Sequence, residues 1–189
     1  MGKLPDIDVD FSNRDNILDI IKHNPASLSD GKKHNTGVYV TDIPMNPLTN
    51  TSTIDFKQAE DRGYFKLDFL NVNVYSGIKD EGHLNKLMSK EPSWHRLWED
   101  ESFCDKVIHV NGHHKLMVKL KPDSMTQMAM FLAVMRPGKA HLQNYDWKQV
   151  AEQVWTKPSD GSYYFKKAHA VAYAHLVAIH VNLLEEQGE

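Results

Sequence analysis

Residues 4–11 read LPDIDVDF, a strict alternation of apolar and acidic residues. Such alternation is typical of a half-buried strand, because successive side chains of a strand point to opposite faces. We therefore expect the apolar residues of this strand to face the core, and Asp6, Asp8 and Asp10 to lie together on the other face. Like charges on one strand face repel each other, so this acidic face calls for an explanation.

The rest of the chain divides into a strand-rich first part and a helix-rich remainder. Strands are expected at residues 37–40 (GVYV) and 63–70 (GYFKLDFL), and a loop is expected over residues 25–35. Helices are expected at residues 16–21, 82–89, 124–135, 147–155 and 167–186. The order predicts an α+β fold with a core over residues 1–90 and a helical extension over residues 91–189, packed together as one compact unit.

Composition narrows the class of protein. The chain has 22 Lys and Arg residues against 25 Asp and Glu residues, which gives a net charge of -3. This charge excludes nucleic-acid binding by bulk positive charge. Any contact with nucleic acid would have to come from a local basic patch. The single Cys104 has no disulfide partner within the chain, which favours a reducing compartment. No apolar run approaches the length of a bilayer span. We therefore expect a cytoplasmic protein without a membrane partner.

Asp68 lies on the predicted strand at residues 63–70, where it shares a face with Lys66. If the two acidic strands are neighbours, Asp68 joins the carboxylates of Asp8 and its neighbours in a set suited to two divalent metal ions. The competing interpretation is a polar strand face whose acids are simply solvated. Periodicity alone leaves both interpretations open.

Six segments carry a family resemblance. Residues 5–11 (PDIDVDF) resemble the P-D-x-D-x-D-F signature of the alpha (catalytic) subunit of bacterial DNA polymerase III. Five further segments resemble motifs of that family in the same order: residues 33–40 (KHNTGVYV), 63–70 (GYFKLDFL), 120–124 (LKPDS), 133–138 (AVMRPG) and 165–174 (FKKAHAVAYA). Six collinear matches are far more specific than any single one.

The resemblance implies a polymerase beta-like nucleotidyltransferase palm with a small mixed or antiparallel sheet and a helical C-terminal extension. It implies that two Mg²⁺ or Mn²⁺ ions are held by catalytic carboxylates, with Asp10 as a supporting metal ligand. By the same resemblance, the catalytic carboxylates are expected to be Asp6, Asp8 and Asp68. The residues implied to contact substrate, primer or phosphate are Lys66, Lys33, His34, Arg136, Lys167 and His169.

Several family segments are missing. The interval between Asp8 and Asp68 is shorter than in that family and lacks its glycine-rich F-G-T-x-x-A-K segment. The short interval between Gly138 and Tyr163 contains neither the Y-Q-E-Q motif nor the basic R-A-M-G-K-K segment of the family's fingers. We also expect the chain to lack the family's N-terminal phosphoesterase-like domain and its C-terminal clamp-binding region. We therefore expect a polymerase core reduced to its palm and a few helices.

Three functions remain open on this basis. The first is a minimal DNA polymerase that adds deoxynucleotides to a primer 3′ end, with DNA and nucleotide as partners. The second is a two-metal DNA nuclease on the same palm. The third is a non-catalytic decoy that binds DNA or a replicase. A protein partner could supply the missing polymerase parts, and the setting expected from the resemblance is a bacterial or phage-infected cell.

Overall fold

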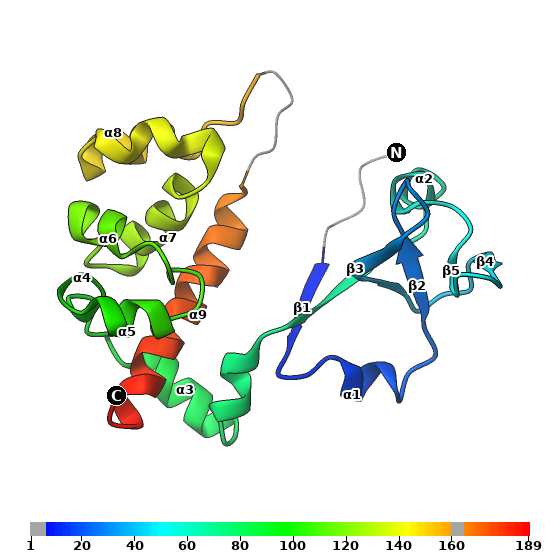
Figure 1. Ribbon diagram of the computed structural model, residues 1–189, viewed down its shortest axis with the longest axis horizontal. Helices are drawn as coiled ribbons and strands as arrows, with labels where there is room; N and C mark the ends of the chain where they lie inside the picture. Colours follow the sequence, from blue (N-terminus) through cyan, green and yellow to red (C-terminus); the bar gives the residue numbers. More distant parts are fainter. Residues whose placement is uncertain (1–6, 160–164) are drawn as a thin grey trace. The chain divides into compact units, whose positions relative to one another are not determined.

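The computed structural model describes residues 7–159 and 165–189 and has the predicted α+β composition. The chain forms two compact units, the first ending at Gly77 and the second beginning at Ile78 (Figure 1). The first unit contains the strands and the second is helical. The predicted packing of residues 91–189 on a core of residues 1–90 stays a prediction.

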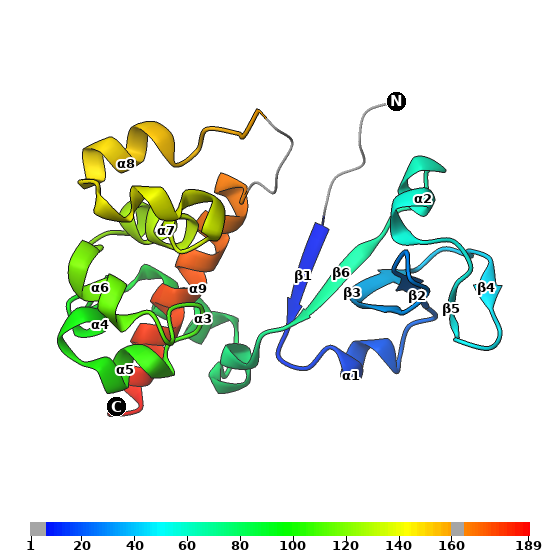
Figure 2. The same cartoon turned by 45° about the horizontal axis from the view of Figure 1, so that its top comes forward.

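A four-stranded mixed sheet organises the first unit, in the order β1-β6-β3-β2 (Figure 2). Its strands are β1 (Ile7–Phe11), β2 (Asn24–Ser27), β3 (Lys33–Tyr39) and β6 (Leu67–Asn71). β1 runs parallel to β6, whereas β3 is antiparallel to both β6 and β2. The mixed character agrees with the prediction, and the parallel pair brings the two acidic strands next to each other.

The predicted alternation in β1 is present, although the apolar face of the strand is only partly buried. Val9 and Phe11 are half-buried, and Ile7 is 39% exposed. Phe11 packs on Phe69 of β6 with ring centroids 4.9 Å apart. This contact joins the two strands on the face opposite the acids.

Short elements complete the first unit: α1 (Asp15–Leu18), β4 (Met45–Asn46), β5 (Thr51–Ser52), α2 (Phe56–Asp61) and the 3₁₀ helix η1 (Asn73–Gly77). β4 and β5 form a separate hairpin. Asp55 caps α2 by accepting hydrogen bonds from the backbone N–H groups of Lys57 and Gln58. A small core of Ala26, Tyr39, Ile43 and Ala59 holds β2, β3 and α2 together.

The prediction of a loop over residues 25–35 is wrong. β2 and the first residues of β3 fall in this stretch, and Ser27 is buried. Its polar composition is compatible with a strand because the backbone N–H and the hydroxyl group of the buried Ser27 both form hydrogen bonds. The Ser27 N–H donates to Ser52 Oγ at 3.0 Å, and the Ser27 hydroxyl donates to the Ile54 carbonyl at 3.0 Å.

Helices make up the second unit: α3 (Glu81–Ser89), α4 (Arg96–Glu99), α5 (Glu101–Lys106), α6 (His114–Leu120), α7 (Met125–Val134), η2 (Pro137–Asn144, 3₁₀), α8 (Trp147–Gln153) and α9 (Lys167–Glu186). The predicted helices corresponding to α3, α7, α8 and α9 are confirmed. Side chains of Asp80, Ser124 and Asp146 cap α3, α7 and α8. α7 ends just before Arg136-Pro137-Gly138, where the sequence predicted a stop.

The core of the second unit lies between α7 and α9. Every residue of α7 from Met128 to Val134 is buried, and Ala170, Ala174 and Val177 of α9 belong to the same cluster. A helix that is apolar all round packs at the centre of a bundle.

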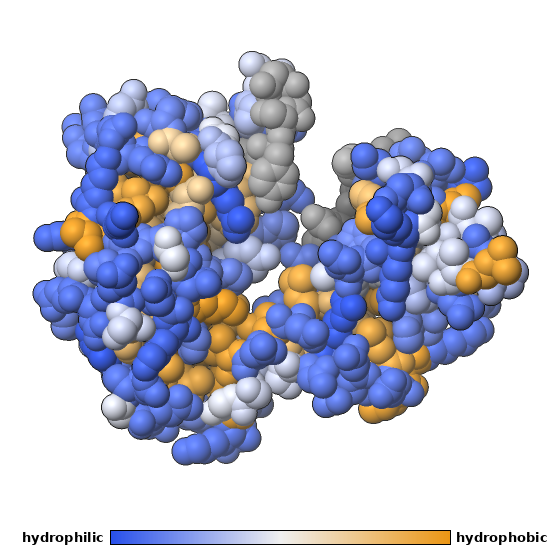
Figure 3. Space-filling model, in the orientation of Figure 1, coloured by the Kyte–Doolittle hydropathy of each residue, from blue (hydrophilic) through white to orange (hydrophobic). Residues whose placement is uncertain are grey.

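The visible face of each unit is mainly hydrophilic, with apolar residues in small separate groups (Figure 3). None of the described helices is long and apolar enough to cross a membrane.

Candidate functional site

The register between β1 and β6 pairs two acids. Asp8 and Asp68 are Cα partners on these adjacent parallel strands, and strands in a sheet are about 4.8 Å apart. Partners in a parallel register point to the same face of the sheet, so both carboxylates belong to one face. Asp8 is exposed, whereas Asp68 is only 8% exposed.

Asp10 extends the acidic face along β1. Its pKa is raised by burial and then by the negative charge of Asp8, while a hydrogen bond from the Tyr75 hydroxyl lowers it. The Asp8 charge therefore acts on Asp10, as expected for carboxylates two residues apart on one strand. Tyr75 comes from η1, which follows β6 directly. Its own pKa is raised by burial and by the Asp10 charge.

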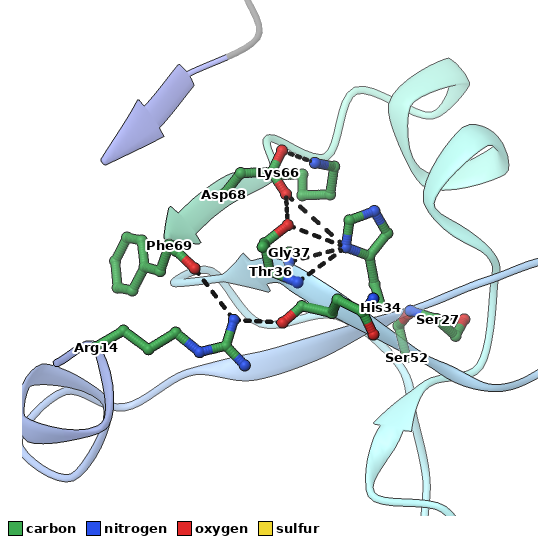
Figure 4. Close-up of polar contacts among 10 residues, drawn as sticks. Arg14, Ser27, His34, Thr36, Gly37, Ser52, Lys66, Asp68 and Phe69 are labelled. Carbon is green, nitrogen blue, oxygen red and sulfur yellow. Dashed lines mark hydrogen bonds and ion pairs between the residues drawn. The ribbon is translucent and has the colours of Figure 1, made fainter. Parts of the chain in front are cut away.

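Both carboxylate oxygens of Asp68 are engaged (Figure 4). Oδ2 forms an ion pair with Lys66, two residues earlier in the chain. Oδ1 accepts a hydrogen bond of 2.6 Å from the Thr36 hydroxyl. The side chains of Lys66 and Asp68 are 17% and 11% exposed, so this pair is largely shielded from water.

A bulge in β3 brings Thr36 to Asp68. The strand pairs Lys33 with Ser27 and Val38 with Pro25, so β3 advances five residues while β2 advances two. The extra residues leave the regular ladder and carry His34 and Thr36. Gly37, immediately after the bulge, is the Cα partner of Asp68 on β6. The bulge thus aims two polar side chains at one carboxylate.

His34 is oriented by the backbone of the same bulge. Its Nδ1 accepts hydrogen bonds from the N–H groups of Gly37 at 2.9 Å and Thr36 at 3.3 Å. The remaining ring proton therefore belongs on Nε2. Burial, followed by the positive charge of Lys66, lowers the pKa of His34, which favours the neutral ring. His34 Nδ1 lies 3.8 Å from Asp68 Oδ1, and its ring meets Phe56 edge-on at 5.2 Å.

Arg14 connects the bulge to β6. Its guanidinium donates to the carbonyl of Asn35 in the bulge and to the carbonyl of Phe69 at 3.1 Å. Its backbone N–H donates to Asn71 Oδ1 at 2.7 Å. Sequence reasoning missed Arg14 because its partners are carbonyls far along the chain. Thr36 was also missed, although its place two residues after His34 in the 33–40 motif was a signal.

The other predicted contact residues are divided between the units. Lys33 is exposed at the start of β3, in the first unit. Arg136 and Lys167 are exposed in the second unit, where the Arg136 guanidinium lies 4.8 Å from the Phe165 ring centroid. Lys167 Nζ lies 6.0 Å from the Trp155 ring centroid. His169, in the same unit, stacks near Tyr173 with ring centroids 6.5 Å apart.

The donor chemistry of the acidic face fits a hard divalent cation. Carboxylate oxygens are the ligands that Mg²⁺ and Mn²⁺ prefer, and the register places Asp8 beside Asp68. Within residues 7–159 and 165–189, no group of three His, Cys, Asp or Glu side chains is arranged to hold a metal ion. Asp6, a predicted ligand, lies outside the described residues. The four-carboxylate set of Asp6, Asp8, Asp10 and Asp68 therefore stays a prediction.

Comparisons of this chain with protein-family models, with curated proteins and with solved structures give no match. The resemblance to the polymerase alpha subunit therefore depends on the sequence motifs alone, and the function that it implies is a proposal.

Proposed function

We propose that this chain is a metal-dependent nucleotidyltransferase acting on DNA, built on a polymerase beta-like palm and adding deoxynucleotides to a primer 3′ end. The observation that carries the proposal is the register of β1 and β6, which pairs Asp8 with Asp68. The two acids belong to different sequence motifs, and adjacent strands are what a shared metal site requires. The mixed sheet of four strands supports the palm assignment.

Under this proposal Asp6, Asp8 and Asp68 hold two Mg²⁺ or Mn²⁺ ions, with Asp10 as a supporting carboxylate. When bound there, two such ions would supply charge neutralisation at the phosphoryl group and activation of the attacking primer oxygen. Basic side chains bind phosphate, and Lys66 lies on the acidic face, against Asp68. The further contacts assigned by the proposal come from Lys33, His34, Arg136, Lys167 and His169.

Primer extension with purified full-length protein tests the proposal. A labelled primer, alone and annealed to a template, is incubated with deoxynucleotides and Mg²⁺ or Mn²⁺. We expect extension by the wild type and a loss of at least about 100-fold with Asp8→Asn or Asp68→Asn. The matched control is Asp42→Asn, because Asp42 is exposed and forms a surface ion pair with Lys22 at 2.9 Å. Absence of extension under every condition, or equal extension by Asp8→Asn, contradicts the proposal.

The nuclease function shares the acidic face and differs in the nucleophile, since water replaces the primer oxygen. Incubation of supercoiled plasmid with Mn²⁺ and no deoxynucleotides separates the two reactions. Nicking that disappears in Asp68→Asn, together with absence of primer extension, replaces the polymerase proposal with the nuclease.

One observation favours the non-catalytic binder as a second candidate. Lys66 and Thr36 already engage both oxygens of Asp68, so this carboxylate is satisfied without a metal ion. A binder of this kind retains DNA or replicase affinity when EDTA is present, and Asp8→Asn does not change that affinity. Binding measured by fluorescence anisotropy, with and without EDTA, distinguishes it from both enzymes.

A further inference from the structure

We propose that Lys66 is a built-in competitor for the metal site, and that a divalent cation binds Asp68 only by displacing the Lys66 ammonium group. The inference deepens the proposed function, since it takes Asp68 as a metal ligand. It concerns how the chain's own residues regulate access to that ligand.

The first step is the confinement of Asp68. This side chain is 11% exposed and extends from the middle of the sheet, between β1 and β3. Thr36 fixes Oδ1 through a 2.6 Å hydrogen bond. The bulge that carries Thr36 is itself tied to β6 by Arg14. Asp68 therefore cannot turn away from Lys66 to meet a cation elsewhere without breaking these contacts.

The second step is the confinement of Lys66. Its aliphatic chain lies over Gly37, so closely that a Cβ at Gly37 would be 2.7 Å from Lys66 Cδ. Its Nζ lies 6.0 Å from the Phe56 ring centroid, within reach of the ring's negative face. Phe56 and Gly37 thus guide the ammonium onto Asp68 Oδ2. Packing on Gly37 and Phe56 therefore holds the Lys66–Asp68 ion pair in place, unlike an ion pair on an exposed surface.

The third step is electrostatic. A divalent cation on Asp68 and the ammonium group on the same carboxylate repel each other, and the low exposure of the site weakens screening by water. Binding of the cation therefore includes the cost of breaking the ion pair, which lowers the apparent affinity. Removing the ammonium removes that cost.

Mn²⁺ binding to the full-length protein, measured by titration calorimetry in the absence of DNA and nucleotide, tests the inference. Lys66→Met keeps most of the aliphatic chain that lies over Gly37 and removes the charge. We expect it to bind Mn²⁺ about tenfold more tightly than the wild type, and Lys66→Arg to resemble the wild type. Thermal unfolding verifies that each variant is folded, and Lys66→Gln takes over the comparison if Lys66→Met does not fold.

Lys57→Met is the matched control for a general charge effect. Lys57 Nζ lies 5.8 Å from the same Phe56 ring centroid, so this variant removes an equal charge nearby and leaves the Lys66–Asp68 pair intact. We expect its Mn²⁺ affinity to stay within about twofold of the wild type. Equal tightening by Lys57→Met and Lys66→Met overturns the inference. So does an unchanged affinity in the uncharged Lys66 variants, or a lack of Mn²⁺ binding by all of them.

Primer extension remains a separate readout. If the wild type extends no primer and Lys66→Met still binds Mn²⁺ more tightly, the proposed function fails and the inference stands. If the wild type extends primers and the affinities are equal, the inference fails and the proposed function stands.

Discussion

Gly37 of β3 lies directly opposite Asp68 of β6, and the absence of a side chain at Gly37 leaves the space that Lys66 and His34 occupy. An ideal Cβ at this position would lie 2.7 Å from Lys66 Cδ, 3.0 Å from His34 Nδ1 and 3.2 Å from Ala26 Cβ. Glycine is therefore required here for close approach. The same position makes the whole cluster sensitive to a single methyl group.

The first prediction concerns Gly37→Ala. The added methyl group overpacks the cluster on three sides, and we expect a loss of about 1 to 3 kcal/mol in the free energy of unfolding. Urea denaturation followed by circular dichroism measures it. Gly82→Ala in α3 is the comparison, because its nearest atom is Asp80 Oδ1 at 3.3 Å and alanine favours a helix. A Gly37→Ala protein as stable as the wild type contradicts the prediction.

The second prediction concerns the hydroxyl group of Thr36. Thr36→Val keeps the shape of the side chain but leaves Asp68 Oδ1 without its 2.6 Å hydrogen bond. Because Asp68 is buried, we expect a loss of about 1 to 3 kcal/mol in the free energy of unfolding. Thr36→Ser should retain most of the stability, and Thr41→Val, at an exposed position, should change it little. Thr36→Val keeps the methyl group and Thr36→Ser keeps the hydroxyl group. A Val variant as stable as the wild type, or a Ser variant that loses as much stability as the Val variant, therefore contradicts the prediction.

The sheet illustrates how far the sequence predicts this fold. The alternation in residues 4–11 and 63–70 indicates two strands with acids on one face, since the two-residue period depends on local geometry alone. The structure has both strands, and they pair in parallel. The β3 bulge was not predictable in this way. It depends on a register shift against β2, which is a property of two paired strands and not of the two-residue period within one strand.

The contacts of the candidate site also fall into two groups, those within one strand, which the sequence predicts, and those between distant segments, which it does not. Lys66 and Asp68 were predicted to share a face because they are two residues apart on one strand, and the structure pairs them. Thr36 and Arg14 act on this site across the sheet, through a hydroxyl group and two backbone carbonyls. Pairing of distant backbone groups leaves no periodic mark in a sequence. Only the fold brings such partners together.

The third prediction concerns Lys139, which holds the end of α8 in the second unit. Its Nζ donates hydrogen bonds of 2.9 Å to the carbonyls of Gln153 and Thr156, at the negative end of the helix dipole. We expect Lys139→Met to lower the free energy of unfolding by about 1 kcal/mol. Lys148→Met removes an exposed lysine from α8 itself and should have a much smaller effect. Chemical denaturation of the two variants side by side measures the difference, and equal effects would contradict the capping role.

The fourth prediction is a loss of stability in mild acid that originates at His180 of α9. Its Nδ1 accepts a 3.0 Å hydrogen bond from the backbone N–H of Ile108, and burial lowers its pKa below the ordinary value of 6.5. The unfolded chain therefore binds a proton more readily than the folded one. The free energy of unfolding should be highest above pH 6.5 and decrease as the pH falls through that value toward the lowered pKa. His109, whose pKa is lowered by burial and by Arg136, acts in the same direction.

Melting temperatures at about pH 7.5 and about pH 5.5 measure the effect. In His180→Asn the difference between these temperatures should shrink without vanishing, because His109 and His34 also have lowered pKa values and remain. His141→Asn, at an exposed position, should keep the wild-type difference, and a difference unaffected by His180→Asn would exclude His180 as a source.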